Sequence, residues 1–559
     1  MKNIAKFLAV GFVFFLSACS LTDLEGNLDN PNEVGVDAVD LNLLNNKIQA
    51  DFGEFFSLAN DPAMDFSRMT ALIGGDTYDR SFDAQEFDDI WERAYQDVLQ
   101  SIETMLGRTD GTPALAIYSG TGRVLKAYTL LTLVDLFGDV PYSQALKGTE
   151  GAANFNPGVD GGRAVYDAAI AMLDEANTLL ATAPAVTGFR DIYYSGDRVK
   201  WNALANTLKL KAYMNLRLTD NTAGGKISTL LAADLIDTDA EEFTYKYGSA
   251  TNPARSRHPL YRQMYGNTTG EVGGYINNQY MNICYKQKGV EDPRWRYYFY
   301  RQVGSINRAL NDDPESVPCI ISPYPSHYPA NMAFCSFDPG FYGRDHGNAD
   351  GIPPDANALT CFGVYPAGGR ADLNDGDANY IGLTVNTQGA LGAGIEPIWM
   401  ASYTDFLKAE AALTVAGAGG DAAALIASGI TKSIARVKAF GAAKGQVVPA
   451  NLIADEAAYL AAVNTAFTSG TDDDKLNVYA KEFYIAAWGN GIETYNLYRR
   501  TQKPGVQDMQ PMRNANPGKF MYSLIYPANF VTLNTTTPQK VFTAVNKVFW
   551  DNNPDNLSF

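Results

Sequence analysis

Apolar residues recur at steps of three and four along several stretches of the chain, which is the pattern of helices that bury one face. These stretches are 85–106, 114–137, 163–181, 198–218, 398–416, 422–440 and 473–499. In 114–137 the apolar positions cover nearly the whole circumference, so we expect this helix to be buried on most sides. Gly107 and Gly138 follow the first two stretches and are expected to end them.

The helical stretches succeed one another as antiparallel pairs, which favours a right-handed, tetratricopeptide-like stack. Their spacing follows no regular repeat of that kind, so we expect degenerate pairs. In 198–218 the basic residues lie off the apolar stripe: Lys200, Lys209, Lys211 and Arg217. Trp91, Trp201, Trp399 and Trp488 fall within helical patterns and are expected in the core.

A long block at 244–396 breaks the helical pattern, because it is rich in tyrosine, glycine and proline. Long irregular regions inside a folded chain commonly carry function. We therefore predict a mainly α fold in which helix pairs pack with a loop-rich ligand-binding subdomain at 244–396. The helical part at 19–243 precedes this subdomain, and the helices and tail at 397–559 complete the same fold.

The first residues have the features of a secretory signal at 1–18. Lys2 and Lys6 precede a short apolar run, and Leu-Ser-Ala-Cys ends at Cys19. This ending resembles the bacterial lipobox, in which cleavage leaves a lipid-modified cysteine as the first residue. Acylated Cys19 would anchor the chain in a membrane without a spanning helix. The alternative is an ordinary signal peptide with an incidental cysteine.

Four further cysteines all lie in the loop-rich block, and an even number in an exported chain allows two disulfides. They are Cys284, Cys319, Cys335 and Cys361. Their spacing leaves all three connectivities open, and buried free thiols are the alternative. No pair has the spacing of a zinc site.

Composition removes several classes of protein. The chain has 559 residues, of which 46% are hydrophobic and 19% charged, so it can bury a large core and is not broadly disordered. Its one long apolar run is the N-terminal one, which excludes a polytopic membrane protein. A net charge of -18 disfavours nucleic acid as a partner.

Several segments, in order along the chain, resemble the SusD/RagB family of outer-membrane nutrient-binding lipoproteins, in its SusD-like branch. The longest are GRVLKAYTLLTLVDLFGDVPYSQAL at 122–146, RVKWNALANTLKLKAYMNLRL at 198–218 and WGNGIETYNLYRRTQKPG at 488–505. Shorter ones are EDPRWRYYF at 291–299, GRDHGNADGIPPD at 343–355, GVYPAGGR at 363–370 and KVFWDNNP at 547–554.

The resemblance implies a SusD-like α-α superhelix on a lipid-anchored protein of the outer membrane that faces the cell exterior. It implies a protein without catalytic activity or cofactor that captures oligosaccharides and delivers them to a SusC-like TonB-dependent transporter. Peptides or other nutrients are alternative cargoes in the same transport role.

A sugar binder needs flat aromatic rings with hydrogen-bonding groups beside them. The loop Tyr78-Asp79-Arg80 supplies this combination, in a region where the resemblance places part of the site. Further candidates in the loop-rich block are Trp295, Tyr324, Tyr328, Phe341 and Tyr342. For Trp295, packing in the core is the favoured alternative.

Two other functions stay open. A surface glycoside hydrolase would use carboxylate pairs such as Asp372 and Asp375, or the run Arg344-Asp345-His346, for which we favour a loop-bracing role. A helical adaptor would bind only a protein. The run 372–377 is rich in carboxylates, but it lacks EF-hand spacing, so a structural Ca²⁺ is an alternative to a solvated turn.

Overall fold

The computed structural model describes most of the chain between residues 39 and 554. The described ranges are 39–72, 82–151, 154–252, 256–265, 274–285, 287–302, 323–326, 328, 332–334, 336–337, 340–347, 359–375, 387–505, 508, 520–541 and 546–554. Cys19, Tyr78, Asp79, Arg80, Cys319 and Cys335 lie outside these residues, so their predicted roles stay predictions.

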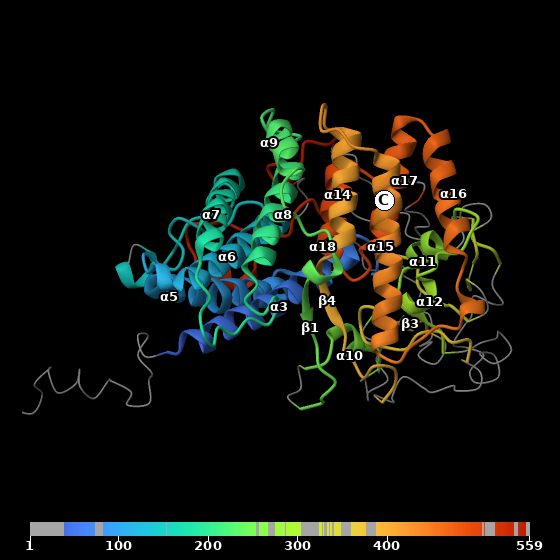
Figure 1. The fold of residues 1–559 in the computed structure, drawn as a ribbon, viewed down its shortest axis with the longest axis horizontal. Coiled ribbons are helices and arrows are strands. Elements are labelled where there is room, and N and C mark those ends of the chain that lie inside the picture. The colour runs from blue at the N-terminus through green and yellow to red at the C-terminus, as the bar shows by residue number, and fades with distance from the viewer. Residues whose placement is uncertain are drawn as a thin grey trace, which may run out of the picture.

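Helices of the first half form one side of the molecule (Figure 1). α5 packs against α6, and α7 packs against α8, as the predicted helix pairs require, and α6 also packs against α7. The elements are α3 (Leu41–Phe66), η2 (Ala84–Phe87), α4 (Asp88–Glu92), the π-helical η3 (Arg93–Leu99), α5 (Gln100–Thr109), η4 (Pro113–Leu115), α6 (Ala116–Phe137), α7 (Gly162–Thr182), α8 (Arg198–Leu216) and α9 (Ala223–Leu230).

Helices of the last part form the other side (Figure 1). α14 packs against α15 and α17, and α18 packs against α3 of the first half. The elements are α14 (Ala401–Thr414), α15 (Ala422–Ala443), α16 (Glu456–Ser469), α17 (Asp472–Ala486) and α18 (Gly491–Thr501), whereas the short α19 (Ala528–Leu533) packs against η2 and α4 of the first half. The mainly helical architecture predicted from periodicity is confirmed.

The loop-rich block is entered and left through two paired strands. β1 (Phe243–Lys246) runs antiparallel to β4 (Ile395–Trp399), with Phe243 opposite Trp399 and Lys246 opposite Ile395. Between them the structure describes only short elements: α10 (Pro259–Tyr265), α11 (Asn278–Tyr285), α12 (Trp295–Tyr298), β2 (Phe299–Tyr300) and β3 (Cys361–Phe362). Residues next to both predicted limits of the block thus lie side by side.

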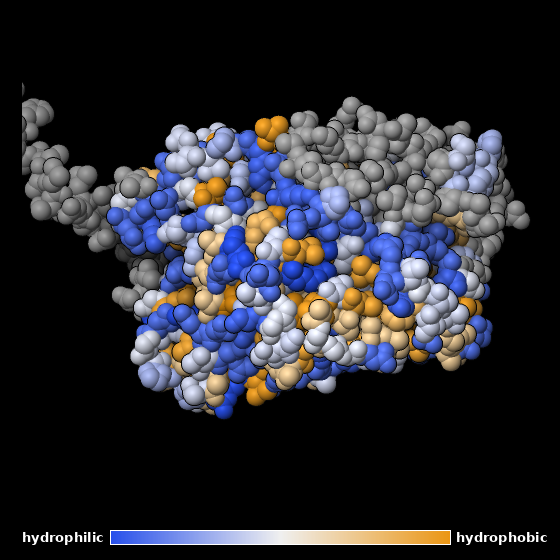
Figure 2. All heavy atoms as spheres, turned by 90° about the horizontal axis from the view of Figure 1, so that it is seen from above, coloured by the Kyte–Doolittle hydropathy of each residue, from blue (hydrophilic) through white to orange (hydrophobic). Residues whose placement is uncertain are grey.

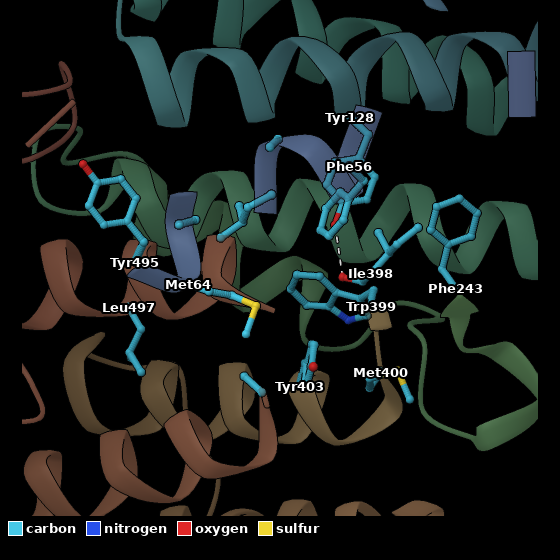
Figure 3. Close-up of a cluster of buried hydrophobic side chains, with 14 of the residues drawn as sticks. Phe56, Met64, Tyr128, Phe243, Ile398, Trp399, Met400, Tyr403, Tyr495 and Leu497 are labelled. Atoms are coloured by element: carbon cyan, nitrogen blue, oxygen red, sulfur yellow. Dashed lines mark hydrogen bonds between the residues drawn. The ribbon is translucent and has the colours of Figure 1, made fainter. Parts of the chain in front are cut away.

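Aromatic and aliphatic side chains from both sides meet in a buried cluster (Figure 3). Phe56 and Met64 come from α3, Tyr128 from α6 and Trp399 from β4. The Tyr128 hydroxyl donates a hydrogen bond of 3.3 Å to the carbonyl of Ile398, so even the polar atom of this ring is satisfied. All four tryptophans expected in the core are buried.

The helices differ from the sequence expectation in three respects. The stretch 473–499 is two helices, because Gly489 has a φ of +90° and the chain turns between α17 and α18. The stretch 85–106 changes from 3₁₀ to α, π and α geometry, and it continues past Gly107 to Thr109. Several helices lie outside the stretches delimited by periodicity, among them α3, which begins at the side-chain cap of Asp40, α9 and α16.

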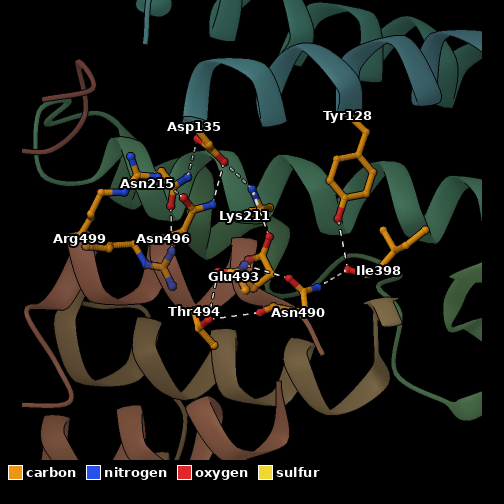
Figure 4. Close-up of polar contacts among 12 residues, drawn as sticks. Tyr128, Asp135, Lys211, Asn215, Ile398, Asn490, Glu493, Thr494, Asn496 and Arg499 are labelled. Carbon is orange, nitrogen blue, oxygen red and sulfur yellow. Dashed lines mark hydrogen bonds and ion pairs between the residues drawn. The ribbon is translucent and has the colours of Figure 1, made fainter. Parts of the chain in front are cut away.

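Charged residues are buried where α6, α8 and α18 meet (Figure 4). Asp135 accepts hydrogen bonds from Lys211 Nζ and Asn496 Nδ2, both at 2.8 Å, and Lys211 Nζ lies 3.3 Å from Glu493 Oε1. Burial lowers the pKa of Lys211, but Asp135 and Glu493 outweigh it and raise that pKa. Lys211 is therefore an interior residue, although it lies off the apolar stripe of its helix.

A second buried ion pair joins α14 to α18. Arg500 donates to both carboxylate oxygens of Glu410 at 2.6 and 2.7 Å, and Arg217 of the α8 C-terminus lies 2.9 Å from Glu410 Oε1. Burial acts to raise the pKa of Glu410, but the two guanidinium groups outweigh it and hold that pKa at about 2. Arg500 also donates to Asn215 at 2.9 Å, which connects this pair to the Asp135 network.

The surface carries both hydrophilic and hydrophobic residues. On the face seen from above, hydrophilic residues are widespread and hydrophobic ones stand in small groups (Figure 2). Among the described helices, none combines the length and the apolar character that crossing a membrane requires.

One carboxyl group is buried without a charged partner. Glu396 of β4 accepts a 3.0 Å hydrogen bond from Asn60 Nδ2 and lies 3.9 Å from Nε2 of His258. Burial raises the pKa of Glu396 to about 8 and lowers that of His258 to about 3, so both side chains are neutral near pH 7.

Replacing Lys211 by methionine is expected to lower the free energy of unfolding by about 3–5 kcal/mol, because the carboxylates of Asp135 and Glu493 stay buried without their cation. Urea unfolding measures the loss. Lys209→Met is the matched control on the same helix, since Lys209 pairs with the exposed Asp174 and its loss costs at most about 1 kcal/mol. Equal effects of the two substitutions would contradict the buried pairing.

Glu396→Gln is expected to flatten the fall of stability with rising pH. In the unfolded chain Glu396 ionises near its ordinary pKa, whereas in the folded protein it stays protonated up to about pH 8. Stability is therefore lost between these two values, by about 1.4 kcal/mol per pKa unit, and an amide avoids this loss. The free energy of unfolding of wild type and variant, measured in urea at about pH 5 and about pH 8.5, tests this expectation. Glu175→Gln, at an exposed position, should keep the wild-type slope.

Candidate functional site

The described residues just before the segment that carries Tyr78, Asp79 and Arg80 lie against the loop-rich block. Thr70 forms an antiparallel bridge with Ile276, and Asn277 bridges in parallel to Arg344. The amide of Gly347 donates a 2.8 Å hydrogen bond to the carbonyl of Leu72. The structure thus joins two regions that the sequence separates by about 270 residues and that both carry predicted ligand contacts.

An exposed tyrosine stands on a buried one in this block. Tyr324 is 52% exposed, and its hydroxyl donates a 3.0 Å hydrogen bond to the carbonyl of Met332. Its ring meets Tyr328 and Phe334 edge to face, with centroids 5.9 and 6.0 Å away. The ring is therefore held in place while one part of it faces solvent, as a stacking platform requires. We call Tyr324, Tyr328 and Phe334 the Tyr324 platform.

A hydrogen bond to Asp345 holds Tyr328 of the platform in place. Tyr328 donates a 2.6 Å hydrogen bond to Oδ1 of Asp345, which also accepts from Asn278 Nδ2 at 2.8 Å. Arg344 lies over the ring of Tyr275, 4.8 Å from its centroid. Burial and Arg68 keep the pKa of His346 well below its usual value. This arrangement fits the loop-bracing role rather than general acid–base chemistry.

Trp295 and Tyr342 are placed differently from their predicted role. Both are about 2% exposed. The Trp295 ring packs against Tyr285, Phe299 and Phe341 at centroid distances of 4.8–4.9 Å, so aromatic side chains occupy the faces on which a sugar would stack. Core packing is the better interpretation of Trp295, and the structure gives Tyr342 no surface for a ligand.

Cys284 and Cys361 are free and buried, and burial raises the pKa of both thiols. The structure therefore does not place these two cysteines in disulfides, and the alternative of buried thiols applies to them. Both side chains lie in the interior as small apolar groups. A bond between Cys319 and Cys335 stays a prediction.

The carboxylates proposed for hydrolysis or calcium binding are paired with arginines. Asp372 pairs with Arg296 and, at 3.2 Å, with Arg301, and Asp375 pairs with Arg370 at 2.5 Å. The guanidinium groups occupy the carboxylate oxygens that would bind a metal ion. They also favour the ionised carboxylate, which disfavours a role as a general acid. Within the described ranges, no cluster of three or more His, Cys, Asp or Glu side chains is placed to hold a metal ion.

A cavity of about 350 Å³ lies between α3, β1, α10 and the junction of α4 with η3. Its lining consists of Glu54, Ser57, Leu58, Asp89, Glu92, Arg93, Asp97, Tyr245, Tyr247, Pro259 and Arg262. Aromatic, acidic and basic groups converge here, as at small-molecule sites. We call this cavity and its extension along α3 the α3–α10 groove.

The extension is formed by two more carboxylates of α3. Desolvation by the surrounding protein raises the pKa of Asp61, although Gln263 of α10 hydrogen-bonds to this carboxyl group. Burial and the nearby charge of Asp61 raise the pKa of Asp65 to about 7, although Thr70 donates a 2.6 Å hydrogen bond to it.

The sequence pattern did not predict the α3–α10 groove. Tyr245 and Tyr247 belong to the tyrosine-rich block, and their residue type alone does not separate them from its other tyrosines. The acidic wall comes from helices 150 residues earlier, and only the fold brings the two together. The one local signal was the alternation of Tyr245 and Tyr247 beside a predicted boundary.

Two protein-family models match most of the described chain. The model described as starch-binding associating with outer membrane matches residues 38–312. The model described as SusD and RagB outer membrane lipoprotein matches residues 375–552. Among curated proteins, no sequence matches.

Solved structures share the fold over nearly their whole length. A chitin-binding protein is 20% identical with a TM-score of 0.62, over 90% of this chain and 99% of that one. A SusD homologue from Bacteroides fragilis NCTC 9343 is 18% identical with a TM-score of 0.62, over 89% and 95%. A chitin-binding SusD homologue from Flavobacterium johnsoniae is 17% identical with a TM-score of 0.60, over 92% and 100%. With its helical architecture and the two family matches, the chain belongs to the SusD/RagB family of outer-membrane proteins.

Proposed function

We propose that the protein captures oligosaccharides at the cell surface and delivers them to a SusC-like TonB-dependent transporter, without cleaving them. Family membership supports a binding role at the outer membrane. Two solved relatives of the same fold are described as chitin-binding, which favours a glycan over a peptide as cargo. Acylated Cys19 would hold the protein at the membrane.

The observation that carries the proposal is the Tyr324 platform. A sugar ring offers C–H groups that stack on an aromatic face, and a fixed face loses little conformational entropy when it binds. Tyr324 is exposed, tethered by its hydroxyl and supported by two further rings. A single platform of this kind gives modest affinity, which suits a ligand that must later be released to a transporter.

A hydrolase is the weaker alternative. The acidic pairs that it would need are held by arginines at Asp372 and Asp375, and Asp345 is committed to Tyr328 and Asn278. We therefore treat turnover of a bound oligosaccharide as the result that would reject the proposal.

Tyr324→Ala is expected to weaken oligosaccharide binding about 2- to 10-fold, since an aromatic contact contributes about 0.5–1.5 kcal/mol beyond its area. Calorimetry against a panel of oligosaccharides measures this loss. Tyr213→Ala, the same substitution at a half-buried position of α8, is the control and should bind as the wild type does. Thermal unfolding checks that both variants fold. Unchanged affinity of Tyr324→Ala for every bound glycan would remove the platform from the site.

Cys19→Ser is expected to move the protein from the membrane fraction to the soluble fraction, because the thiol that would carry the lipid is gone. Fractionation of cells that express each form measures the shift, and Cys284→Ser serves as the control at a buried thiol. Continued membrane attachment of Cys19→Ser would show that acylation of this residue is not the anchor.

A further inference from the structure

Carboxyl groups follow one face of α3 from the cavity to beyond it. Glu54 and Ser57 line the cavity, and Asp61 and Asp65 follow Ser57 at steps of four residues, on the same face of α3. Gln263 of α10 reaches across to Asp61. This row of side chains therefore extends from the cavity to Asp65, which accepts a hydrogen bond from Thr70. At Thr70 the chain pairs with the loop-rich block.

Several carboxyl groups along the groove have no cationic partner among the described residues. Arg93 is already shared among Asp51, Glu54 and Asp97, at 3.4, 3.1 and 2.8 Å. Arg262 is the other basic residue of the lining. In the described part of the chain, no ion pair within 4.0 Å involves any of four other carboxylates along the groove: Asp61, Asp65, Asp89 and Glu92.

Two tyrosine rings also line the cavity. Tyr245 and Tyr247 meet edge to face, with centroids 5.1 Å apart, and Tyr247 packs on His258 at 4.6 Å. Tyr245 lies directly over Gly53, where an added Cβ would come within 2.4 Å of the ring. Both rings are thus fixed, and they provide aromatic surface beside carboxylates.

The helix across the cavity has an unusual backbone. Arg93 begins the π-helical segment η3, which also presents Asp97 to the cavity. Segments of π-helix are rare and occur frequently at functional sites. The lining is therefore shaped by a local departure from α geometry, and not only by the packing of regular helices.

Aromatic rings beside unpaired carboxylates form the environment that recognises an ammonium group, through cation–π attraction and charge-assisted hydrogen bonds. Among glycans, positive charge comes from sugars with free amino groups. We infer that the α3–α10 groove binds an oligosaccharide of amino sugars in their unacetylated, protonated form. This inference rests on the proposed function and specifies the ligand class.

Electrostatics distinguishes this ligand from a neutral one. A neutral sugar donates hydrogen bonds to the carboxylates but gains no charge attraction, and an anionic one is repelled. The raised pKa of Asp65 agrees with a site that lacks a cation when empty. Binding of an ammonium group favours ionised Asp65, so we expect uptake of the ligand to release protons near pH 7.

The test compares a glucosamine tetramer with its fully N-acetylated counterpart by calorimetry at low salt and at about 0.5 M salt. The wild type is expected to bind the amine form about 10-fold more tightly at low salt and to lose most of this preference at high salt. Asp61→Asn and Glu92→Gln should each weaken binding of the amine form about 3- to 10-fold and leave the acetylated form unchanged.

Asp472→Asn is the matched control, because it removes the same charge from a fully exposed position at the start of α17. Equal affinity for the two tetramers, or an equal loss in Asp472→Asn, would overturn the inference and leave glycan capture intact. A lysine tetrapeptide that competes as well as the sugar would overturn the assignment to amino sugars. Binding of neither tetramer also overturns the inference, while the glycan panel with Tyr324→Ala decides the proposed function separately.

Discussion

The carboxylate of Asp135 lies in the interior where three helices meet, and its charge has to be matched there. Lys211 and Asn496 supply that match, and Lys211 in turn is held by Glu493. A buried charge without its partner is costly, so α6, α8 and α18 have one acceptable register with respect to one another. The segments that resemble the SusD/RagB family at 122–146, 198–218 and 488–505 each contribute to this network, which gives that resemblance a structural reason.

A rigid helical frame allows the rest of the chain to depart from regular structure. β1 and β4 pair at the two ends of the loop-rich block, so the block starts and finishes at one fixed place on the frame. Its described segments are then braced by side chains, as Asp345 braces Tyr328. The two surfaces to which we assign ligand contacts, the Tyr324 platform and the α3–α10 groove, both depend on this arrangement.

Periodicity predicted most helices because each buries a stripe against one neighbour, and α6 was recognised as buried all round. It could not place Lys211, whose burial depends on carboxylates from two other helices. Periodicity also predicted a single helix in place of α17 and α18, since the turn at Gly489 lies within a continuous apolar pattern. The exposed Tyr324 was among the predicted contacts, and Trp295, for which core packing was the favoured alternative, is buried. The α3–α10 groove required contacts between distant segments.

Gly53 lies on the buried face of α3, and its missing side chain is the space that the Tyr245 ring occupies. One methyl group at this position would force the Tyr245 ring, which lines the cavity, to move, although no lining residue would be replaced. The shape of the cavity thus depends on Gly53, a residue that does not line it. Relatives that differ at this single position could admit cargoes of different girth while keeping the same chemical groups around them.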